Sequence, residues 1–466
     1  MNPLLYEVFA RVWLAETGAT SLATIPDAEL DRLAAAGFDH LWLMGVWTIG
    51  PLGAEIARHH EGVGRDLDVF YPGWTPGDVV GSPYAVARYA VDPGLGGDAA
   101  LAILRSRLAQ RAIRLVLDFI PNHTARDHHW IREAPEIYVH ELDGAIACGK
   151  DPYFPAWTDT AQLDHRLACT RDHMVETLLA IAARCDGVRC DMSMLVLGDI
   201  FERTWHDLPP SPNEPLPTGE FWPAAIDAVR ALHPEFLFLA EAYWDLEARL
   251  QRLGFDFTYD KTLYDRLLHG DAASLRAHLA ADLEYQARSA RFLENHDEPR
   301  LARELTAEKR AAALVIAMTV PGLRFIHDGQ IEGRRVRTAI QLGKRAIEAP
   351  ELAAQRLHAT LFAVLKLPAL RDGAYRPLAL HDSDAIVAHR WEHRAGSVIV
   401  AVNYSAEETS GRVIVDLHGI DGRNVVLRDR MTGIEYQRDG TELVDPARGL
   451  YVVLAPWQAH VFELAG

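Results

Sequence analysis

The apolar positions along residues 1–372 follow two patterns that alternate along the chain. Short apolar runs with few polar interruptions are typical of strands buried on both faces of a parallel sheet. We expect such strands at residues 4–14, 38–44, 113–119, 187–191, 236–240, 255–259, 291–297 and 322–327. Apolar residues at helical spacing lie between them, so we expect helices at 27–36, 98–111, 171–184, 219–232, 306–319 and 351–366. The alternation indicates an α/β fold, and eight strands are the number of a (β/α)8 TIM barrel.

Two long segments interrupt this pattern. Residues 47–96 are rich in Gly and Pro and hold several aromatic residues, so we expect an irregular, functional loop there. A second excursion, after the third strand, predicts a short inserted subdomain at 123–168. The predicted barrel therefore comprises residues 1–122 and 169–372.

The pattern changes again near Pro377. Short strand-like runs at 385–391, 397–403, 412–417, 424–427 and 450–454 follow one another with turn residues and no helical segment between them. Such a series is typical of a small all-β unit, and we expect a C-terminal β-sandwich at residues 373–466.

Charge and composition exclude several classes of partner. The chain has 65 Asp and Glu against 47 Lys and Arg, a net charge of −18. We therefore expect neither nucleic acid nor an anionic membrane as a partner, because both need clustered positive charge, whereas a neutral sugar fits. The four cysteines show no C-x-x-C spacing, which argues against a zinc site or a disulfide framework. The N-terminal segment resembles no signal peptide, so we expect a cytoplasmic protein; its oligomeric state stays open.

Chemically useful side chains gather where several predicted strands end. Asp118 lies at the end of the third strand, and His123 follows it. Arg189 and Asp191 end the fourth strand, Glu241 ends the fifth, and His296-Asp297 ends the seventh. One such residue alone is more often a helix cap or an ion-pair partner. In a barrel, however, the carboxyl ends of the strands converge. Several acids brought together there repel one another, so such a cluster indicates a function that uses them.

Glycoside hydrolysis needs two carboxyl groups with different tasks. One attacks the anomeric carbon, and a second, kept protonated by its surroundings, donates a proton to the leaving oxygen. Arg189 points to the same side of its strand as Asp191 and can hold it ionised. Glu241, flanked by Tyr243 and Trp244, is the better candidate for the neutral acid.

The strand ends resemble the sequence signatures of the α-amylase family of glycosidases, glycoside hydrolase family 13. DFIPNHT at 118–124 is similar to D-x-x-x-N-H, DGVRCDM at 186–192 to G-x-R-x-D, and FLENHD at 292–297 to F-x-x-N-H-D. AEAYW at 240–244 stands where the family has its acid-bearing E-x-W, with one additional residue before the Trp. The four segments occur in the family's order.

The resemblance implies Asp191 as nucleophile, Glu241 as general acid and base, and Asp297 as a carboxylate that binds the distorted sugar. It also implies that four further residues belong to the substrate-binding site. His123 and His296 would hydrogen-bond the sugar, and Tyr84 would be its stacking platform. Arg189 would orient the nucleophile. Three further residues are candidates for substrate binding through their place beside these acids or in the long loop: Trp47, Met192 and Trp244. Asp118 is expected to be structural.

We therefore expect a retaining α-glycosidase acting on short α-glucans. The alternative is a transglycosylase that passes the glucosyl or maltosyl unit to a sugar or to phosphate, because the chemistry up to the covalent intermediate is shared. A non-catalytic sugar-binding or partner subunit is disfavoured, since all three carboxyls are present. Asn122 is compatible with calcium, which it helps to hold in relatives, but the sequence lacks a full ligand set, and we predict no metal or other cofactor.

Overall fold

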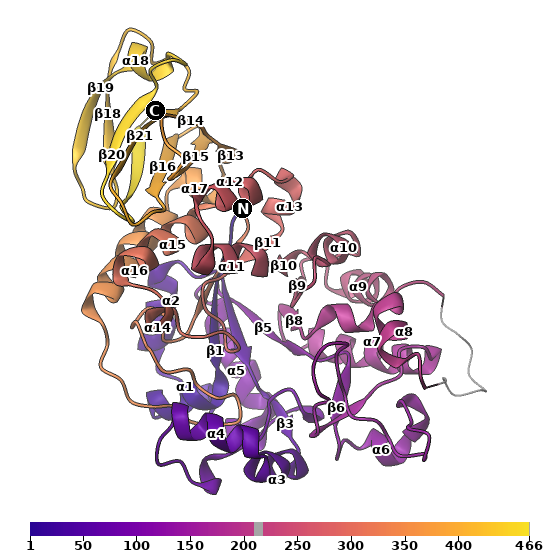
Figure 1. Ribbon diagram of the computed structural model, residues 1–466. Coiled ribbons are helices and arrows are strands. Elements are labelled where there is room, and N and C mark those ends of the chain that lie inside the picture. The colour runs from indigo at the N-terminus through magenta and orange to yellow at the C-terminus, as the bar shows by residue number, and fades with distance from the viewer. Residues whose placement is uncertain (209–217, 466) are drawn as a thin grey trace. The chain divides into compact units, whose positions relative to one another are not determined.

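The computed structural model describes residues 1–208 and 218–465, and within these residues eight strands close into a parallel barrel (Figure 1). Their order around the barrel is β1-β12-β11-β10-β9-β8-β5-β2. The strands are β1 (Leu4–Phe9), β2 (His40–Met44), β5 (Arg114–Phe119), β8 (Gly187–Cys190), β9 (Leu237–Ala240), β10 (Phe257–Tyr259), β11 (Ser289–Arg291) and β12 (Leu323–His327). The predicted barrel is confirmed.

The chain divides into two compact units, and the division crosses the barrel. One unit comprises Tyr6–Tyr259 and Val336–Ile347; the other comprises Met1–Leu5, Asp260–Arg335 and Glu348–Gly466. These units are not the domains expected from the sequence, and the expected domain boundaries at 122, 168 and 372 stay a prediction.

In the first unit, β2, β5, β8, β9 and β10 are parallel neighbours. All residues of β2, β8 and β9 are buried, which explains their nearly continuous apolar sequences. The connecting helices include α2 (Asp27–Ala36), α5 (Gly97–Ala109), α7 (Ala168–Ala182) and α9 (Phe221–Leu232), close to their predicted ranges. The barrel strands are thus held by packing on both faces.

The first predicted strand is wrong in its second half. Strand β1 ends at Phe9, and residues 10–17 form helix α1 (Ala10–Thr17), which ends at Gly18 with φ 67°. The guanidinium of Arg11 donates to the carbonyl of Gly45 at 2.7 Å and to Asp92 at 2.8 Å. These hydrogen bonds to residues remote in sequence favour a helix over a continued strand. The apolar pattern of residues 4–14 does not indicate them.

The segment 47–96 is also more regular than expected. It contains β3 (Trp47–Ile49), helices α3 (Pro51–His59) and α4 (Glu61–Phe70), and β4 (Val86–Val91). Pro51 begins α3, where its fixed φ is favourable, and Asp127 accepts from the backbone N–H of Leu52 at 3.0 Å. The helices bury an apolar cluster shared with the distant segment 336–347: Ala57, Leu67, Val79, Ala339 and Leu342.

The predicted inserted segment carries little regular structure. Strands β6 (His123–Ala125) and β7 (Thr160–Gln162) pair antiparallel, and α6 (Trp130–Glu133) lies between them in sequence. After β8 come a short 3-10 turn, η5 (Ser193–Val196), and helix α8 (Gly198–Trp205).

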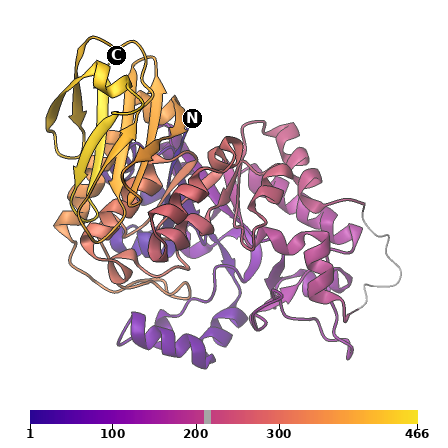
Figure 2. The ribbon, with the colours of Figure 1, turned by 45° about the horizontal axis from the view of Figure 1, so that its top comes forward.

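In the second unit, β11 and β12 are parallel, and the helices include α11 (Lys261–His269), α12 (Ala272–Leu279), α15 (Ala307–Thr319) and α16 (Leu352–Leu365). The C-terminal part forms two antiparallel sheets, seen from a second side in Figure 2. One has the order β13-β15-β16-β21-β18-β19, and the other β14-β17-β20. Their bounds are β13 (Ala374–Pro377), β14 (Ala379–His381), β15 (Ile386–His393), β16 (Gly396–Asn403), β17 (Thr409–Ile414), β18 (Asn424–Asp429), β19 (Glu435–Asp439), β20 (Leu450–Leu454) and β21 (Ala459–Ala465).

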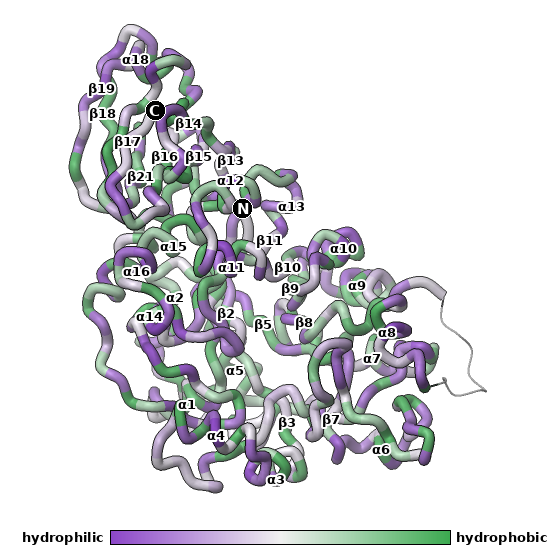
Figure 3. Tube along the Cα trace, in the orientation of Figure 1, coloured by the Kyte–Doolittle hydropathy of each residue, from purple (hydrophilic) through white to green (hydrophobic). Residues whose placement is uncertain are grey.

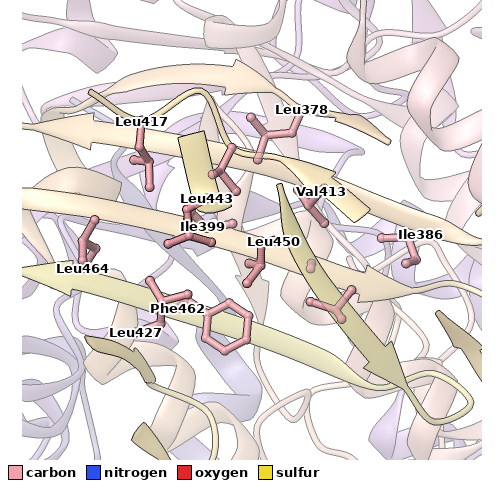
Figure 4. Close-up of a cluster of buried hydrophobic side chains, with 14 of the residues drawn as sticks. Leu378, Ile386, Ile399, Val413, Leu417, Leu427, Leu443, Leu450, Phe462 and Leu464 are labelled. Atoms are coloured by element: carbon pink, nitrogen blue, oxygen red, sulfur yellow. The ribbon is translucent and has the colours of Figure 1, made fainter. Parts of the chain in front are cut away.

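Apolar side chains from both sheets fill the space between them, as a sandwich requires (Figure 4). Ile399 and Phe462 come from the larger sheet, and Val413 and Leu450 from the smaller one. The expected apolar strands are present, the run of β16 among them (Figure 3). Four strands (β13, β14, β19 and β21) and helix α18 (Gly440–Val444) were not expected, because their sequences are largely polar or lack alternation. Among the described residues, no helix has the length and apolar content needed to cross a membrane.

Candidate active site

A single guanidinium joins the two acids that follow β8 and β9. Arg189 Nη1 donates to Asp191 Oδ1 at 2.7 Å, and its Nη2 lies 2.8 Å from Glu241 Oε2. Arg189 is 0% exposed, and the two acids are 5% and 4% exposed. From the sequence we expect Arg189 to hold Asp191; the structure adds Glu241 to the same cation.

The backbone positions both acids directly at the strand ends. The N–H of Asp191 donates to the carbonyl of Phe119 at 2.8 Å, and that of Glu241 to the carbonyl of Cys190 at 3.0 Å. At the other end of β8, a Cβ on Gly187 would come within 2.6 Å of the Leu237 Cβ. Glycine there allows β8 and β9 to approach, and this close approach sets the spacing of the two acids.

The surroundings of Glu241 differ from those expected. Besides Arg189, the hydroxyl of Tyr243 donates to Oε1 at 2.9 Å and the backbone N–H of Met192 donates to Oε2 at 2.6 Å. Met192 has φ 41° and ψ 50°, the left-handed conformation that turns its N–H towards the acid. Two hydrogen bonds and the Arg189 cation stabilise the ionised carboxylate, whereas we expect from the sequence a neutral acid among aromatic rings. The difference arises because Tyr243 presents its hydroxyl.

Three aromatic rings surround Arg189. Its guanidinium carbon lies 5.2 Å from the ring centre of Trp42, 5.3 Å from that of Tyr84 and 5.7 Å from that of Tyr259. Nε also donates to the Tyr259 hydroxyl at 3.4 Å. Burial opposes the charge of Arg189, but Glu241, together with Tyr259, Tyr84 and Asp191, raises its pKa well above the usual value. Arg189 therefore stays cationic between the two acids.

His123 is a neutral, buried ring next to Tyr84. Burial lowers the pKa of His123 to about 4, despite an opposing effect of Asp159 and a hydrogen bond to the Tyr84 backbone. Its ring lies 5.1 Å from that of Trp157. Tyr84 itself is half-buried. At neutral pH His123 can therefore exchange hydrogen bonds with a neutral ligand without adding charge.

The other two aromatic candidates differ in exposure. Trp47 is 1% exposed, and its indole N–H donates to the carbonyl of Asp118 at 2.8 Å, so it lies in the packing beneath the loop. Trp244 is half-buried, has φ 64°, and meets Tyr153 edge-on with ring centres 4.9 Å apart. Asp118 accepts from the Trp42 indole at 2.9 Å and from the Gly45 N–H at 2.7 Å, a structural role.

The segment after β11 lies in the second unit. Strand β11 ends at Arg291, earlier than expected, and the residues that follow it form a turn. The Asn295 side chain accepts from the N–H groups of Asp297 at 2.9 Å and Glu298 at 2.8 Å. These hydrogen bonds compete with the backbone hydrogen bonds that would continue the strand. His296 is buried with Nε2 3.1 Å from Asp297 Oδ2, and the Asp297 side chain is 44% exposed.

The side chain of Asn122 is hydrogen-bonded to a neighbouring amide. Its Oδ1 accepts from Gln162 Nε2 at 3.0 Å, and its Nδ2 donates to Gln162 Oε1 at 3.2 Å. The two amides thus satisfy each other. Among the described residues no group of three or more His, Cys, Asp or Glu side chains could hold a metal ion.

Sequence reasoning did not assign three contacts of this site. No sequence pattern indicates the contacts of the Tyr259 hydroxyl with Arg189 and of the Met192 N–H with Glu241, because the barrel brings each pair together from separate strands. Tyr153 stands in DPYFP, where two aromatic residues between prolines could have been noticed as a rigid, exposed turn.

Comparison with known proteins supports the resemblance to the α-amylase family. A family model for the alpha-amylase catalytic domain matches residues 77–162. The chain is 24% identical over 461 residues to the alpha-amylase MalA of Haloarcula japonica, with 95% of this chain and 61% of that protein covered. It is 28% identical to the alpha-1,4-glucan:maltose-1-phosphate maltosyltransferase of Pseudomonas aeruginosa, with 54% of this chain and 35% of that protein covered.

The fold is shared with solved structures. A noncanonic maltogenic alpha-amylase, AmyB, from Thermotoga neapolitana superimposes with a TM-score of 0.75 at 20% identity, with 100% of this chain and 99% of that chain covered. The chain spans less than two thirds of the length of the two sequence relatives. The predicted resemblance to the α-amylase family and the predicted fold are confirmed.

Proposed function

We propose, from the resemblance to the α-amylase family, that the chain is a retaining α-glycosidase acting on short α-glucans. The observation that carries this proposal is the pair Asp191 and Glu241 on one buried guanidinium. Two carboxyls held by adjacent nitrogens of one Arg favour the close spacing of retaining enzymes, about 5–5.5 Å, over the roughly 6.5–9.5 Å of inverting ones.

In the first step, Asp191 attacks the anomeric carbon and the bond to the leaving oxygen breaks. Arg189 donates to Oδ1 and holds the attacking carboxylate in place. Glu241, protonated in this step, transfers its proton to the leaving oxygen, and the glycosyl group becomes an ester of Asp191. Asp191 and Glu241 approach the same guanidinium, and a proton on Glu241 removes the repulsion between the two carboxylates.

In the second step, Glu241 is ionised and acts as the base. It takes a proton from water, the water oxygen attacks the anomeric carbon, and the Asp191 ester breaks with retention of configuration. The donors from Tyr243 and Met192 stabilise Glu241 in this ionised state. The Arg189 ion pair does the same for Asp191 as it leaves.

The remaining residues keep the roles that the resemblance implies. Asp297 and His296 would bind the sugar at the cleavage site, and His123 and Tyr84 would contact its hydroxyls and its face. Transfer to a sugar or to phosphate is the second candidate, and similarity to the maltosyltransferases supports it. Hydrolysis and transfer differ in whether water or an acceptor meets the Asp191 ester.

The test is product analysis with maltotriose and maltoheptaose, with and without phosphate and acceptor sugars. We expect the wild-type protein to release shorter sugars and Asp191→Asn to lose at least about a thousandfold in kcat, because the covalent step is removed. Longer sugars or sugar phosphates would establish transfer in place of hydrolysis. Equal activity in wild type and Asp191→Asn would contradict both.

A further inference from the structure

We propose that Lys261 and Glu298 are positioning residues that hold Asp297 in place for the distorted sugar. The inference rests on the proposed function, in which Asp297 binds the sugar at the cleavage site. Glu298 follows Asp297 directly in the loop after β11, and Lys261 is the first residue of helix α11. All three residues belong to the second unit.

The turn that carries Asp297 is anchored through its backbone and through one side chain. Asn295 Oδ1 accepts from the N–H groups of Asp297 and Glu298. The Glu298 side chain, 16% exposed, then reaches helix α11, where its Oε1 lies 3.3 Å from Lys261 Nζ. The Tyr264 hydroxyl is also hydrogen-bonded to Glu298. The carboxylate next to Asp297 in sequence is thus tied to a helix.

Tyr264 connects the same helix to the start of the loop. Its ring stacks on that of Phe292, with centres 5.5 Å and planes 23° apart, and Phe292 is the first residue after β11. Burial raises the pKa of Tyr264 and Glu298 adds to the effect, so the hydroxyl keeps its proton and donates to Glu298. Lys261 Nζ lies 4.3 Å from the centre of the Tyr264 ring. Helix α11 therefore holds the Asp297 loop near its beginning and beside Asp297.

Another ion pair in this loop shows what a structural contact looks like. Arg300 Nη1 lies 2.8 Å from Glu294 Oε2, and the two side chains are 1% and 2% exposed. The Lys261 side chain, in contrast, is 26% exposed, and a partly exposed ion pair contributes little to stability. The pair of Lys261 and Glu298 is therefore better placed to restrict Asp297 than to stabilise the fold.

A small displacement of Asp297 should affect the transition state more than the bound substrate. Positive charge develops on the sugar as the glycosidic bond breaks, and a carboxylate stabilises this charge only when it is correctly placed. The Asp297 side chain is 44% exposed, so packing alone does not fix it. A looser loop should lower kcat and leave KM nearly unchanged.

The experiment measures hydrolysis of α-maltosyl fluoride by Lys261→Met, Glu298→Gln and the double variant. We expect each single variant to lower kcat by about tenfold, with KM changed by less than about twofold. The double variant should lose no more than either single variant, because both substitutions break the same contact. Lys261→Arg should keep most of the wild-type kcat, since it retains the ion pair.

Asp265→Asn is the matched control, because Asp265 pairs with the same Lys261 at 2.5 Å but is 51% exposed and lies in the helix. It should leave kcat unchanged, and every variant should unfold at the same urea concentration as wild type. Unchanged kcat in Glu298→Gln, or an equal loss in Asp265→Asn, would overturn the inference. So would a loss of kcat that accompanies a lower urea midpoint. In these cases wild-type hydrolysis still supports the glycosidase.

If wild type does not hydrolyse the fluoride, the proposed function fails by itself, and a binding measurement tests the positioning of Asp297. The probe is 1-deoxynojirimycin, a cationic sugar analogue, with glucose as its neutral counterpart. We expect Glu298→Gln to bind the analogue about tenfold more weakly than wild type and to bind glucose equally well. Equal binding of the analogue by both proteins, or no binding by either, would overturn the inference.

Discussion

Arg189 and Arg291 are both fully buried on barrel strands, yet their surroundings differ. Arg189 serves two carboxyls, Asp191 and Glu241, and is faced by aromatic rings. Arg291 pairs with one carboxyl, Asp260, and its other nitrogens donate to Gln286 and to the carbonyl of Pro321 at 2.8 Å. One cation is shared between acids, and the other is saturated by a single acid and uncharged acceptors.

The difference separates a reactive arrangement from a structural one. Asp260 has a second partner, His278 Nε2 at 2.9 Å, and it caps helix α11 by accepting from Leu263 N–H at 3.0 Å. Its charge is compensated by the groups around it. At Arg189 two acids approach the same cation and repel one another, an arrangement that is typical of functional sites.

The largest expected effect is on folding, from Asp260→Asn. The amide keeps the helix cap but removes the charge opposite Arg291, which leaves a buried cation poorly compensated. We expect a loss of about 3–5 kcal/mol in the free energy of unfolding, measured by chemical denaturation. The folded fraction should keep its kcat/KM on α-maltosyl fluoride. A stable but inactive Asp260→Asn would show that the two arginines do not differ as described.

The second prediction concerns low pH. We expect the free energy of unfolding of both units to fall with pH, because each unit contains a buried neutral histidine. Burial lowers the pKa of His165 to about 4 and that of His358 to about 4, and each ring bonds a backbone carbonyl. As pH falls below about 6.5 the unfolded chain binds these protons first, so stability falls until about pH 4, by roughly 3 kcal/mol for each ring.

Urea denaturation between pH 7 and pH 4 measures this effect. We expect His358→Gln, and separately His165→Gln, to show a shallower fall than wild type, since Gln has no proton to bind. A slope identical to that of wild type in both variants would mean that other groups cause the acid sensitivity. Such a result would leave the contrast between the arginines unaffected.

The smallest expected effect is that of Tyr259→Phe, which deletes the hydroxyl 3.4 Å from Arg189 Nε. The contact is long, and the ring remains, so we expect kcat/KM to fall by no more than about threefold, with KM unchanged. The matched control is Tyr404→Phe, whose hydroxyl donates to the carbonyl of Leu267 in the other unit. It should lower stability only. A large loss of activity in Tyr259→Phe would make the aromatic surroundings of Arg189 as important as its carboxyls.

The sequence predicts the barrel well because its strands are buried on both faces and their apolar runs are short and separate. It predicts the positions of Asp191 and Glu241 for the same reason, since each follows such a run directly. It does not predict that α1 replaces the second half of the first strand, because Arg11 is fixed by Gly45 and Asp92, which are remote in sequence.

The environment of Glu241 shows the same limit. Period-two alternation places Arg189 beside Asp191, but the Arg189–Glu241 pair depends on how β8 lies against β9. The N–H of Met192 reaches Glu241 only because Met192 is left-handed, a backbone state that no pattern of residue types indicates for methionine.

The segment 336–347 has a consequence for how the chain is made. Helices α3 and α4 bury Ala57 and Leu67 against Ala339 and Leu342, and Val79 forms a β-bridge with Leu342. On the ribosome, at about 5–20 residues per second, these helices wait on the order of tens of seconds before Leu342 exists. Their apolar side stays uncovered for that time, so the early helical pair is a natural binding target for nascent-chain chaperones.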